Sequence, residues 1–521
     1  KCKCLVGARE GQDNGEPLID SLDMVERYFG LKANCWDNAS CTSQFRMMFG
    51  STRDLDPHRT IPLVARPSPH LEGMQVYMPE DASGTGNAGL LSESGPSTAG
   101  AMPNLKGKPI IVGTVRMGFG HHRIAYSAVT WALECGAQPY LLDILGIDCE
   151  ETQRVTEMDK MYSKASRISS NMGGIVDEIW SKMMLSGGVN ALRISCLLAE
   201  QLKPLMASLP KDVPLIAAHP WIGQIAVACG MKTVINLVID NHPQYFVLVP
   251  GAYNLVQAPS YFSKLLNMGI PAATLQYAGH WVSSEIAGNA KADCEARIVR
   301  CQKKLPLRVL IAIGGAGAQQ KYVQGFVLGM RPLLESGRVK LYINSGDHSF
   351  MAEHLRGLFE KEGLEFALHR SQAALDGFCK EHALGRLDHM VSDPMVTIFN
   401  FETHYEAFRA TDYLIRVCDV LATKPSELAF FPVPKLHLRH VGGHECYSAT
   451  RSCELGDGTV ECTTVPMALQ HLELMAQEVS PLLLQMNRSI IENDRAKVYN
   501  GSKVAVELAL SVQQYEPLTH A

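Results

Sequence analysis

Short apolar runs alternate with segments of helical periodicity along most of the chain after residue 106. In the first half, the apolar pattern predicts buried strands at 110–115, 138–144, 213–218, 232–239 and 255–258. Helical patterns lie between them, at 124–134, over 151–208, from residue 223 and at 260–268. Strands that are apolar throughout and separated by helices are typical of a parallel sheet with helices on both faces.

A polar and charged stretch at 280–304 interrupts this alternation, and we interpret it as the connection between two domains. The alternation then restarts, with strands expected at 307–313, 339–344, 364–368, 396–401, 417–422 and 435–438. Helices are expected at 319–334, 466–487 and 503–510. The two halves therefore predict an α/β protein with two Rossmann-like, doubly wound parallel-sheet domains that face a shared cleft.

The N-terminal region shows one clear helical pattern, at 18–29. A stretch rich in Gly, Ser, Ala and Pro follows at 79–103 and has the composition of a linker. We therefore expect an N-terminal extension with its linker, a first Rossmann-like domain, a second Rossmann-like domain and C-terminal helices. Their expected bounds are 1–103, 104–300, 301–455 and 456–521.

Composition narrows the class of partner. Of the 521 residues, 46% are apolar and 19% charged, which is ordinary for a globular protein, and the net charge of −5 argues against a nucleic-acid binder. No run of 18 uncharged apolar residues occurs, so we expect no membrane-spanning helix, while peripheral membrane contact through a local patch stays open. Fifteen cysteines without framework spacing predict free thiols in an intracellular reducing compartment, cytoplasmic or organellar (plastid or mitochondrial).

A tract rich in His and Cys near the end of the second domain contains residue types that bind metals. Its members are His437, His440, His444, Cys446, Cys453 and Cys462. Their spacing matches no common zinc pattern, so we expect no metal site and interpret the tract as a surface loop region.

The segment 110–128 shows the most informative chemistry in the chain. Its apolar strand ends in Gly118 and Gly120, followed by His121 and His122 at the start of a helical pattern. Glycines let a ligand approach the backbone, and a helix start offers unpaired N–H groups to an anion. The alternative is that these residues form a tight turn, in which His121 and His122 only make hydrogen bonds to the backbone at the start of the helix. A second glycine loop follows a later strand and contains Gly314, Gly315 and Gly317.

Polar side chains follow further predicted strands. His219 and His242 each precede a proline, and Asp240 lies just before His242. They are either site residues at the carboxyl edge of the sheet or caps of the turns that follow. The strand at 417–422 is followed by Thr423, Lys424 and Glu427. Glu427 is either a ligand contact or the first-turn acid of a helix.

Six segments in order resemble the GT-B glycosyltransferases, and within them the branch of monogalactosyldiacylglycerol synthase and the peptidoglycan lipid-linked N-acetylglucosaminyltransferase. The segments are 118–125, 215–221, 238–246, 256–279, 310–317 and 419–429. The first is similar to the family's Gly-Gly-Gly-His loop, with His121 at the family histidine. The last is similar to its donor-side Asp…Thr-Lys-x-Gly…Glu segment. The resemblance spans about 106–450 and implies a hexosyltransferase.

The resemblance also implies a division of labour between the domains. The first would bind a lipid or small hydroxylated acceptor, with His121 as the base and Asp240 orienting it or acting as the base itself. The acceptor side would include Gly118, Gly120, His122, His219 and His242. The second domain would bind a uridine-diphosphate sugar as donor substrate through Gly314, Gly315, Gly317, Thr423, Lys424 and Glu427. The implied reaction is inverting and needs neither metal nor cofactor, because helix ends and N–H groups stabilise the leaving diphosphate.

Two alternatives stay open. Relative to the family, the donor-side loop at 424–427 is shortened and lacks its glycines, and Pro425 removes a backbone donor. Together with the N-terminal extension, this favours a catalytically degenerate GT-B protein that serves as a binding or scaffold subunit of a larger protein assembly. The carboxylates and histidines around the cleft also suit a GT-B-fold epimerase that acts on a nucleotide sugar.

Overall fold

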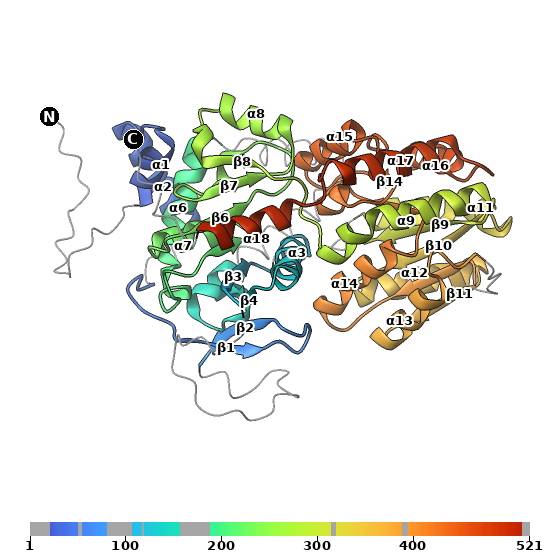
Figure 1. The fold of residues 1–521 in the computed structure, drawn as a ribbon, viewed down its shortest axis with the longest axis horizontal. Coiled ribbons are helices and arrows are strands. Elements are labelled where there is room, and N and C mark those ends of the chain that lie inside the picture. Colours follow the sequence, from blue (N-terminus) through green and yellow to red (C-terminus); the bar gives the residue numbers. More distant parts are fainter. Residues whose placement is uncertain are drawn as a thin grey trace.

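The chain forms two parallel-sheet domains that lie side by side (Figure 1). The computed structural model describes residues 21–49, 55–80, 107–116, 119–156, 188–313, 319–387 and 394–512. The expected fold class, two Rossmann-like α/β domains, is confirmed by the strand orders of the two sheets. Four parts of the sequence interpretation lie outside the described residues: most of the linker at 79–103, Gly118, residues 157–187 of the helical pattern at 151–208, and the glycine loop with Gly314, Gly315 and Gly317.

The first domain is built on an eight-stranded sheet of order β1-β2-β4-β3-β5-β6-β7-β8. Its strands are β1 (Leu63–Pro67), β2 (Gln75–Pro79), β3 (Pro109–Thr114), β4 (Gln138–Asp143), β5 (Leu215–Ala217), β6 (Val234–Leu237), β7 (Tyr253–Val256) and β8 (Leu275–Tyr277). Only β1 and β2 pair antiparallel, and the other described neighbours pair in parallel. β5 and β6 are buried over their whole length, so their residues are apolar except Asn236, whose amide donates to the Val247 carbonyl and to Asn254.

The described part of the expected N-terminal extension is integral to this domain. β2 pairs with β4, and helix α1 (Ser21–Phe29) buries Val25 and Phe29 against the first domain. Helix α2 (Cys35–Phe49) packs with α1 on α6 (Val189–Gln201). Strands of five residues carry too few positions for a clear period, so the sequence pattern missed this hairpin. Helices α3 (Gly120–Glu134), α7 (Pro220–Ala228) and α8 (Pro259–Asn267) follow their strands as expected.

The second domain has a six-stranded parallel sheet of order β11-β12-β10-β9-β13-β14. Its strands are β9 (Leu307–Ala312), β10 (Val339–Asn344), β11 (Phe366–His369), β12 (Val396–Phe399), β13 (Val420–Thr423) and β14 (Lys435–His437). Its helices include α12 (Ser349–Glu362), α13 (Gln372–Glu381), α14 (His404–Ile415) and α15 (Cys446–Glu454).

Two helices expected as single elements are each divided at a proline. The pattern at 319–334 forms α10 (Gln320–Gly329) and α11 (Arg331–Glu335), with Pro332 in the first turn of α11. The pattern at 466–487 forms α16 (Val465–Met475) and α17 (Pro481–Arg495), and Ser480 caps the second helix. Proline fits the first turn of a helix but not its interior, so each one starts a new helix.

The polar stretch at 280–304 is not a connection but a helix of the second domain, α9 (Ser284–Gln302). Two of its charged residues, Arg297 and Arg300, are buried, and Arg297 donates to the carbonyls of Ile415 and Cys418. Arg300 makes a two-pronged ion pair with Asp419. The chain therefore leaves the first domain before α9, at 278–283, and not at the boundary expected near residue 300.

The last helix, α18 (Gly501–Val512), returns to the first domain and lies against α3, β5 and β6 (Figure 1). The chain thus crosses between the domains twice, and the two crossings touch through their backbones. The N–H of His280 donates to the Val498 carbonyl at 2.6 Å, and the N–H of Gly501 donates to the His280 carbonyl at 3.0 Å. A Cβ on Gly279 would lie 2.5 Å from the Val498 oxygen, and Gly279 has a φ of +97°.

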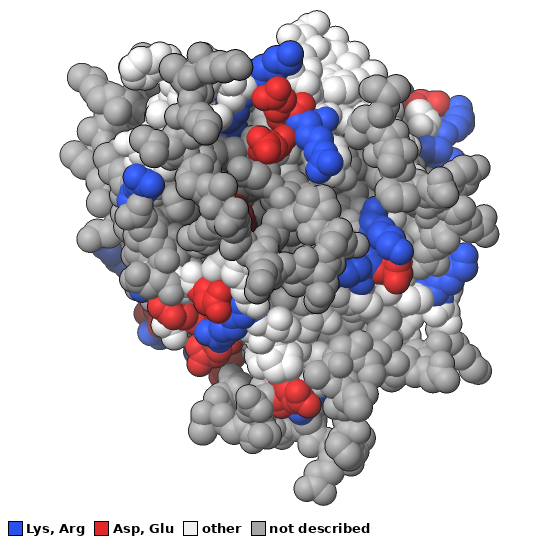
Figure 2. Space-filling view, turned by 90° about the vertical axis from the view of Figure 1, so that its left-hand side faces the viewer, with Lys and Arg blue, Asp and Glu red and all other residues white. Residues whose placement is uncertain are grey.

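On the face in Figure 2, the Lys and Arg side chains of the described residues lie among Asp and Glu side chains. Within the described ranges, no helix is long and apolar enough to cross a membrane.

We expect Gly279→Ala to destabilise the protein by about 2 kcal/mol or more, because the methyl group would meet the Val498 oxygen and the backbone is left-handed there. Gly288→Ala is the matched control: Gly288 lies inside α9 with no atom within 4 Å of the added Cβ. That change should stabilise by about 0.5–1 kcal/mol, since alanine favours helix. Denaturant unfolding measures both, and equal effects would contradict the packing of the two crossings.

Candidate active site

The predicted site residues lie on loops at the carboxyl edges of the two sheets, and these edges face each other. In the first sheet β3, β5 and β6 are neighbours, and the loops after them carry His121, His219 and Asp240. In the second sheet β13 and β14 are neighbours, and the loops after them carry Lys424, Glu427, His444 and Glu445. Each sheet reverses its strand order there, next to β3 or β9, and such switch points are where ligands bind in open α/β sheets.

His121 is held in a single tautomer by the backbone. Its Nδ1 lies 2.8 Å from the Ala218 carbonyl oxygen. A carbonyl can only accept, so Nδ1 carries the proton and the neutral ring keeps its lone pair on Nε2. Burial lowers the pKa of His121, although the Ala218 bond and the charges of Asp240 and Glu427 oppose this. The ring is therefore neutral at pH 7 and has a basic nitrogen available.

His219 takes the opposite tautomer. It is the N-cap of α7, and its Nδ1 accepts from the backbone N–H of Trp221 at 3.1 Å. The proton of the neutral ring is therefore on Nε2. Its ring meets the His121 ring edge-on at 4.4 Å between centroids, and burial together with His121 lowers its pKa well below the usual value. The pair offers one nitrogen acceptor and one N–H donor, and the capping role foreseen for His219 coexists with its place beside His121.

Asp240 occupies a left-handed backbone position, with a φ of +56°. Asp is one of the few residues that tolerates this conformation, which is common at functional turns. Its Oδ2 lies 3.7 Å from Nε2 of His444, which belongs to the second domain. Burial raises the pKa of Asp240, His444 opposes the shift, and Glu445 raises it further. The raised pKa makes Asp240 a candidate proton donor or acceptor.

On the second domain, Lys424 forms an ion pair with Glu445. The other oxygen of Glu445 accepts from the N–H groups of Val441 at 2.8 Å and Gly442 at 3.3 Å. Burial raises the pKa of Glu445, but Lys424 and these donors outweigh it and lower the pKa to about 2. Sequence reasoning missed Glu445 as a site residue. The glycine pair and His444 before it resemble the 118–122 pattern after β3 and were the available signal.

Glu427 and Gly120 meet across the domain interface. Glu427 starts a short 3-10 turn, η6 (Glu427–Phe430), and not a regular helix. A Cβ on Gly120 would lie 3.2 Å from Oε2 of Glu427, so the glycine leaves room for this carboxylate at the start of α3. Thr423, Lys424 and Glu427 line a small cavity between the domains. The same cavity is lined by Phe119, Arg123, Ala312, Ile313, Asn344, Thr411, Ser426 and Leu428.

Two predicted acceptor-side histidines lie apart from His121. His122 faces β4, with Nε2 3.4 Å from Oδ2 of Asp143, and its ring is 5.2 Å from that of His404 in α14. His242 packs on Tyr447 of α15 at 4.4 Å between ring centroids, and burial lowers its pKa to about 4. Both histidines contact the second domain, so they help to hold the two domains together around His121.

The His/Cys tract is not a surface loop region, because His437 and Cys462 are buried in the second domain. Burial and Lys435 lower the pKa of His437 to about 3. Within the part of the chain that the structure describes, no three His, Cys, Asp or Glu side chains are grouped as metal ligands.

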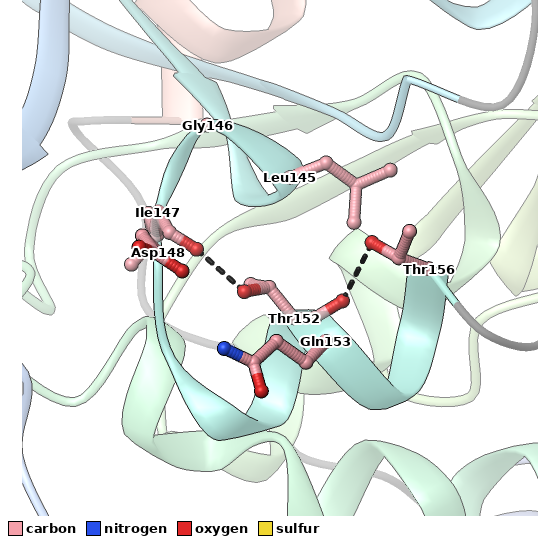
Figure 3. Close-up of a pocket in the computed structure, with 7 residues that line it drawn as sticks. All are labelled: Leu145, Gly146, Ile147, Asp148, Thr152, Gln153 and Thr156. Atoms are coloured by element: carbon pink, nitrogen blue, oxygen red, sulfur yellow. Dashed lines mark hydrogen bonds between the residues drawn. The ribbon is translucent and has the colours of Figure 1, made fainter. Parts of the chain in front are cut away.

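A second hollow lies after β4 and is lined by Leu145, Gly146, Ile147, Asp148, Thr152, Gln153 and Thr156 (Figure 3). The Thr152 hydroxyl donates to the Ile147 carbonyl at 2.5 Å, and the Thr156 hydroxyl donates to the Thr152 carbonyl at 2.8 Å. These hydroxyls serve the local backbone, and no residue predicted from the sequence lines the hollow. The domain interface therefore remains the candidate site.

Two family models match consecutive parts of the chain. Residues 84–265 match a domain of unknown function (DUF6937), and residues 270–510 match another (DUF6938). No curated protein matches the sequence significantly.

Solved structures to which the chain is similar include an epimerase and a glycosyltransferase. A UDP-GlcNAc 2-epimerase from Neisseria meningitidis bound to UDP-GlcNAc has a TM-score of 0.43 and 12% identity, over 77% of this chain and 100% of that one. A glycosyltransferase from Rickettsia africae has a TM-score of 0.38 and 12% identity, over 79% of this chain and 100% of that one. Because both TM-scores lie below 0.5, neither a fold nor a function is assigned to this chain from them.

We expect His219→Asn to keep the α7 cap and to make the protein less sensitive to acid. The pKa of His219 is lower in the folded chain than in the unfolded chain. Below pH 6.5 the unfolded chain therefore takes up a proton that the folded chain does not, and the free energy of unfolding decreases as the pH decreases. Without this histidine, the decrease in the free energy of unfolding from pH 7.5 to pH 5.5 should be smaller by about 1.4 kcal/mol. His219→Ala should show the same gain but lose about 1 kcal/mol at pH 7.5 with the cap. Urea unfolding at both pH values measures this, and an unchanged pH dependence would contradict the buried neutral ring.

Proposed function

We propose that this protein is an enzyme that acts on a nucleotide-diphosphate sugar and transfers its hexosyl group to a lipid or small hydroxylated acceptor. One observation carries the proposal: His121 presents a basic Nε2 where the carboxyl edges of the two sheets meet, opposite Lys424 and Glu427. A base on one domain and a cation on the other are what transfer from a diphosphate needs. The ordered resemblance to GT-B glycosyltransferases supports the same class.

In the proposed reaction, Nε2 of His121 accepts the proton of the acceptor hydroxyl while its oxygen attacks the anomeric carbon. The bond from that carbon to the diphosphate oxygen breaks, and the nucleoside diphosphate leaves with the electron pair. The resulting imidazolium is stabilised by the nearby charges of Asp240 and Glu427. Lys424 offsets the negative charge on the leaving group. Because attack and departure occur on opposite faces, the reaction inverts the anomeric centre.

The donor half of the proposal assigns distinct work to three residues. Thr423 ends β13 and is buried at the cavity wall, where its backbone and hydroxyl shape the phosphate side. Lys424 is oriented by Glu445, which leaves part of its ammonium for a ligand. Glu427 can accept hydrogen bonds from ribose hydroxyls. Its place next to Gly120 means that a bound donor would touch both domains.

A second candidate is epimerisation of a nucleotide sugar. The favouring observation is a carboxyl beside the histidine base: the charge of Asp240 acts on His121, and burial raises the pKa of Asp240, so it can serve as an acid. Transfer needs one base, whereas epimerisation removes and returns a proton at carbon and uses an acid as well as a base. Incubation with a nucleotide sugar in D₂O separates the two, since only epimerisation places deuterium on the sugar carbon.

We expect a uridine-diphosphate sugar to raise the melting temperature of the full chain. At 100 times Kd the stabilisation should be about 2.7 kcal/mol. Glu427→Ala should abolish this shift, while Glu473→Ala, an exposed carboxylate on α16, should keep it. If no nucleotide or nucleotide sugar shifts the wild-type protein, the catalytic proposal fails and the non-catalytic scaffold replaces it.

We expect a substitution of His121 to lower kcat much more than it lowers the affinity for the nucleotide. His121→Asn keeps a donor toward the Ala218 carbonyl but has no basic nitrogen, so we expect kcat to fall by about 10²–10⁴-fold with nucleotide affinity unchanged. In the wild type, kcat/KM should fall only on the acid side of pH 6.5, because burial lowers the pKa of the base. Steady-state rates over pH 5–9 test this. An acid limb above pH 7 or full activity of the variant would reject His121 as the base.

A further inference from the structure

An arginine of the first domain is inserted into the second. Arg123 lies in the second turn of α3, and its guanidinium forms an ion pair with Asp412 of α14. The same guanidinium lies between two aromatic rings of the second domain, 5.9 Å from the centroid of Phe408 and 5.7 Å from that of Phe431. Only 3% of Arg123 is exposed, so its charge is held away from water at the domain interface.

The ion pair leaves both partners incompletely bonded. One Nη of Arg123 reaches one oxygen of Asp412, whereas a guanidinium and a carboxylate can make two parallel bonds. Among the described residues, neither Nε of Arg123 nor Oδ2 of Asp412 has a hydrogen-bond partner. A buried donor without an acceptor costs free energy. An incompletely bonded buried pair is therefore poor as a stabilising element and leaves donor capacity for something else.

The unused donor capacity lies at the proposed site. Arg123 lines the small interdomain cavity together with Thr423, Lys424 and Glu427. Both cations on this wall are paired, Lys424 with Glu445 and Arg123 with Asp412, but Nε of Arg123 has no hydrogen-bond partner among the described residues, so Arg123 keeps an unused donor. The flanking rings of Phe408 and Phe431 fix the plane of its guanidinium.

We infer that Arg123 binds the diphosphate group of the ligand from the domain opposite to the donor loop, with Asp412 holding the guanidinium in place. The inference rests on the proposed function and adds to it the residue that binds the diphosphate. A guanidinium fork matches two phosphate oxygens, which gives it an orientation that an ammonium lacks. Because Arg123 comes from the first domain and Lys424 from the second, the diphosphate joins the two halves.

The test measures binding to the full chain by calorimetry, with uridine, UDP and inorganic pyrophosphate as probes. Two variants change the arginine: Arg123→Lys keeps the charge and loses the fork, and Arg123→Met with Asp412→Asn removes the pair together so that no buried charge is left alone. The control is Arg409→Met, because Arg409 also packs across the interface, 5.5 Å from the Tyr126 ring, but does not line the cavity.

We expect both Arg123 variants to weaken UDP and pyrophosphate binding at least tenfold and to leave uridine binding unchanged, while Arg409→Met changes none of the three. Variants that bind UDP as the wild type does would overturn the inference and leave the proposed function standing. Equal weakening of uridine and UDP would also overturn it, since the effect would then come from the fold. A wild-type protein that binds neither UDP nor pyrophosphate would reject the proposed function itself.

Discussion

The backbone contact between the two interdomain crossings is the constraint on which the candidate site depends. Gly279 and Gly501 let the crossings approach so closely that no side chain fits between them. His280, inside the first crossing, also places its Nδ1 2.8 Å from the carbonyl of Phe430. Phe430 ends the turn that begins with Glu427. The first crossing therefore determines the position of the Glu427 carboxylate relative to α3. A change in the crossing would move Glu427 through the short turn that joins it to Phe430.

Charges between the domains specify this arrangement more than they stabilise it. Asp240 with His444 and Arg123 with Asp412 are paired across the interface and lie largely out of water. Removing charges from water costs about as much as such pairs return, so the favourable free energy must come from apolar contacts. Tyr126, Tyr405 and Phe408 form an aromatic cluster at the same interface and supply part of it. The ion pairs then penalise any relative orientation of the domains that would separate them.

Burial also explains why histidines rather than carboxylates are the neutral bases of this interface. Desolvation disfavours the charged form, so it lowers the pKa of His121 and His219 and raises that of Asp240. At pH 7 the histidine pair is therefore neutral, with one acceptor nitrogen and one donor N–H fixed by backbone partners. Asp240 can take part in proton exchange because the same burial brings its charged and neutral forms closer in free energy, whereas Lys424 keeps Glu445 charged.

The sequence by itself determined the elements and the loops that carry the site. A parallel strand covered by helices on both faces must be apolar along its length, so the apolar runs located most of the strands, and polar residues directly after them marked His121, His219, Asp240, Lys424 and Glu427. Hydrophobic periodicity does not predict which residues far apart in the sequence contact each other. Arg123 and Asp412 are 289 residues apart, and His122 meets His404 across the interface. The return of α18, the addition of β1 and β2 to the first sheet and the meeting of Glu427 with Gly120 were likewise decided only by the tertiary structure. Each depends on how two separately predictable sheets are turned toward each other, and no local pattern of residues encodes that orientation.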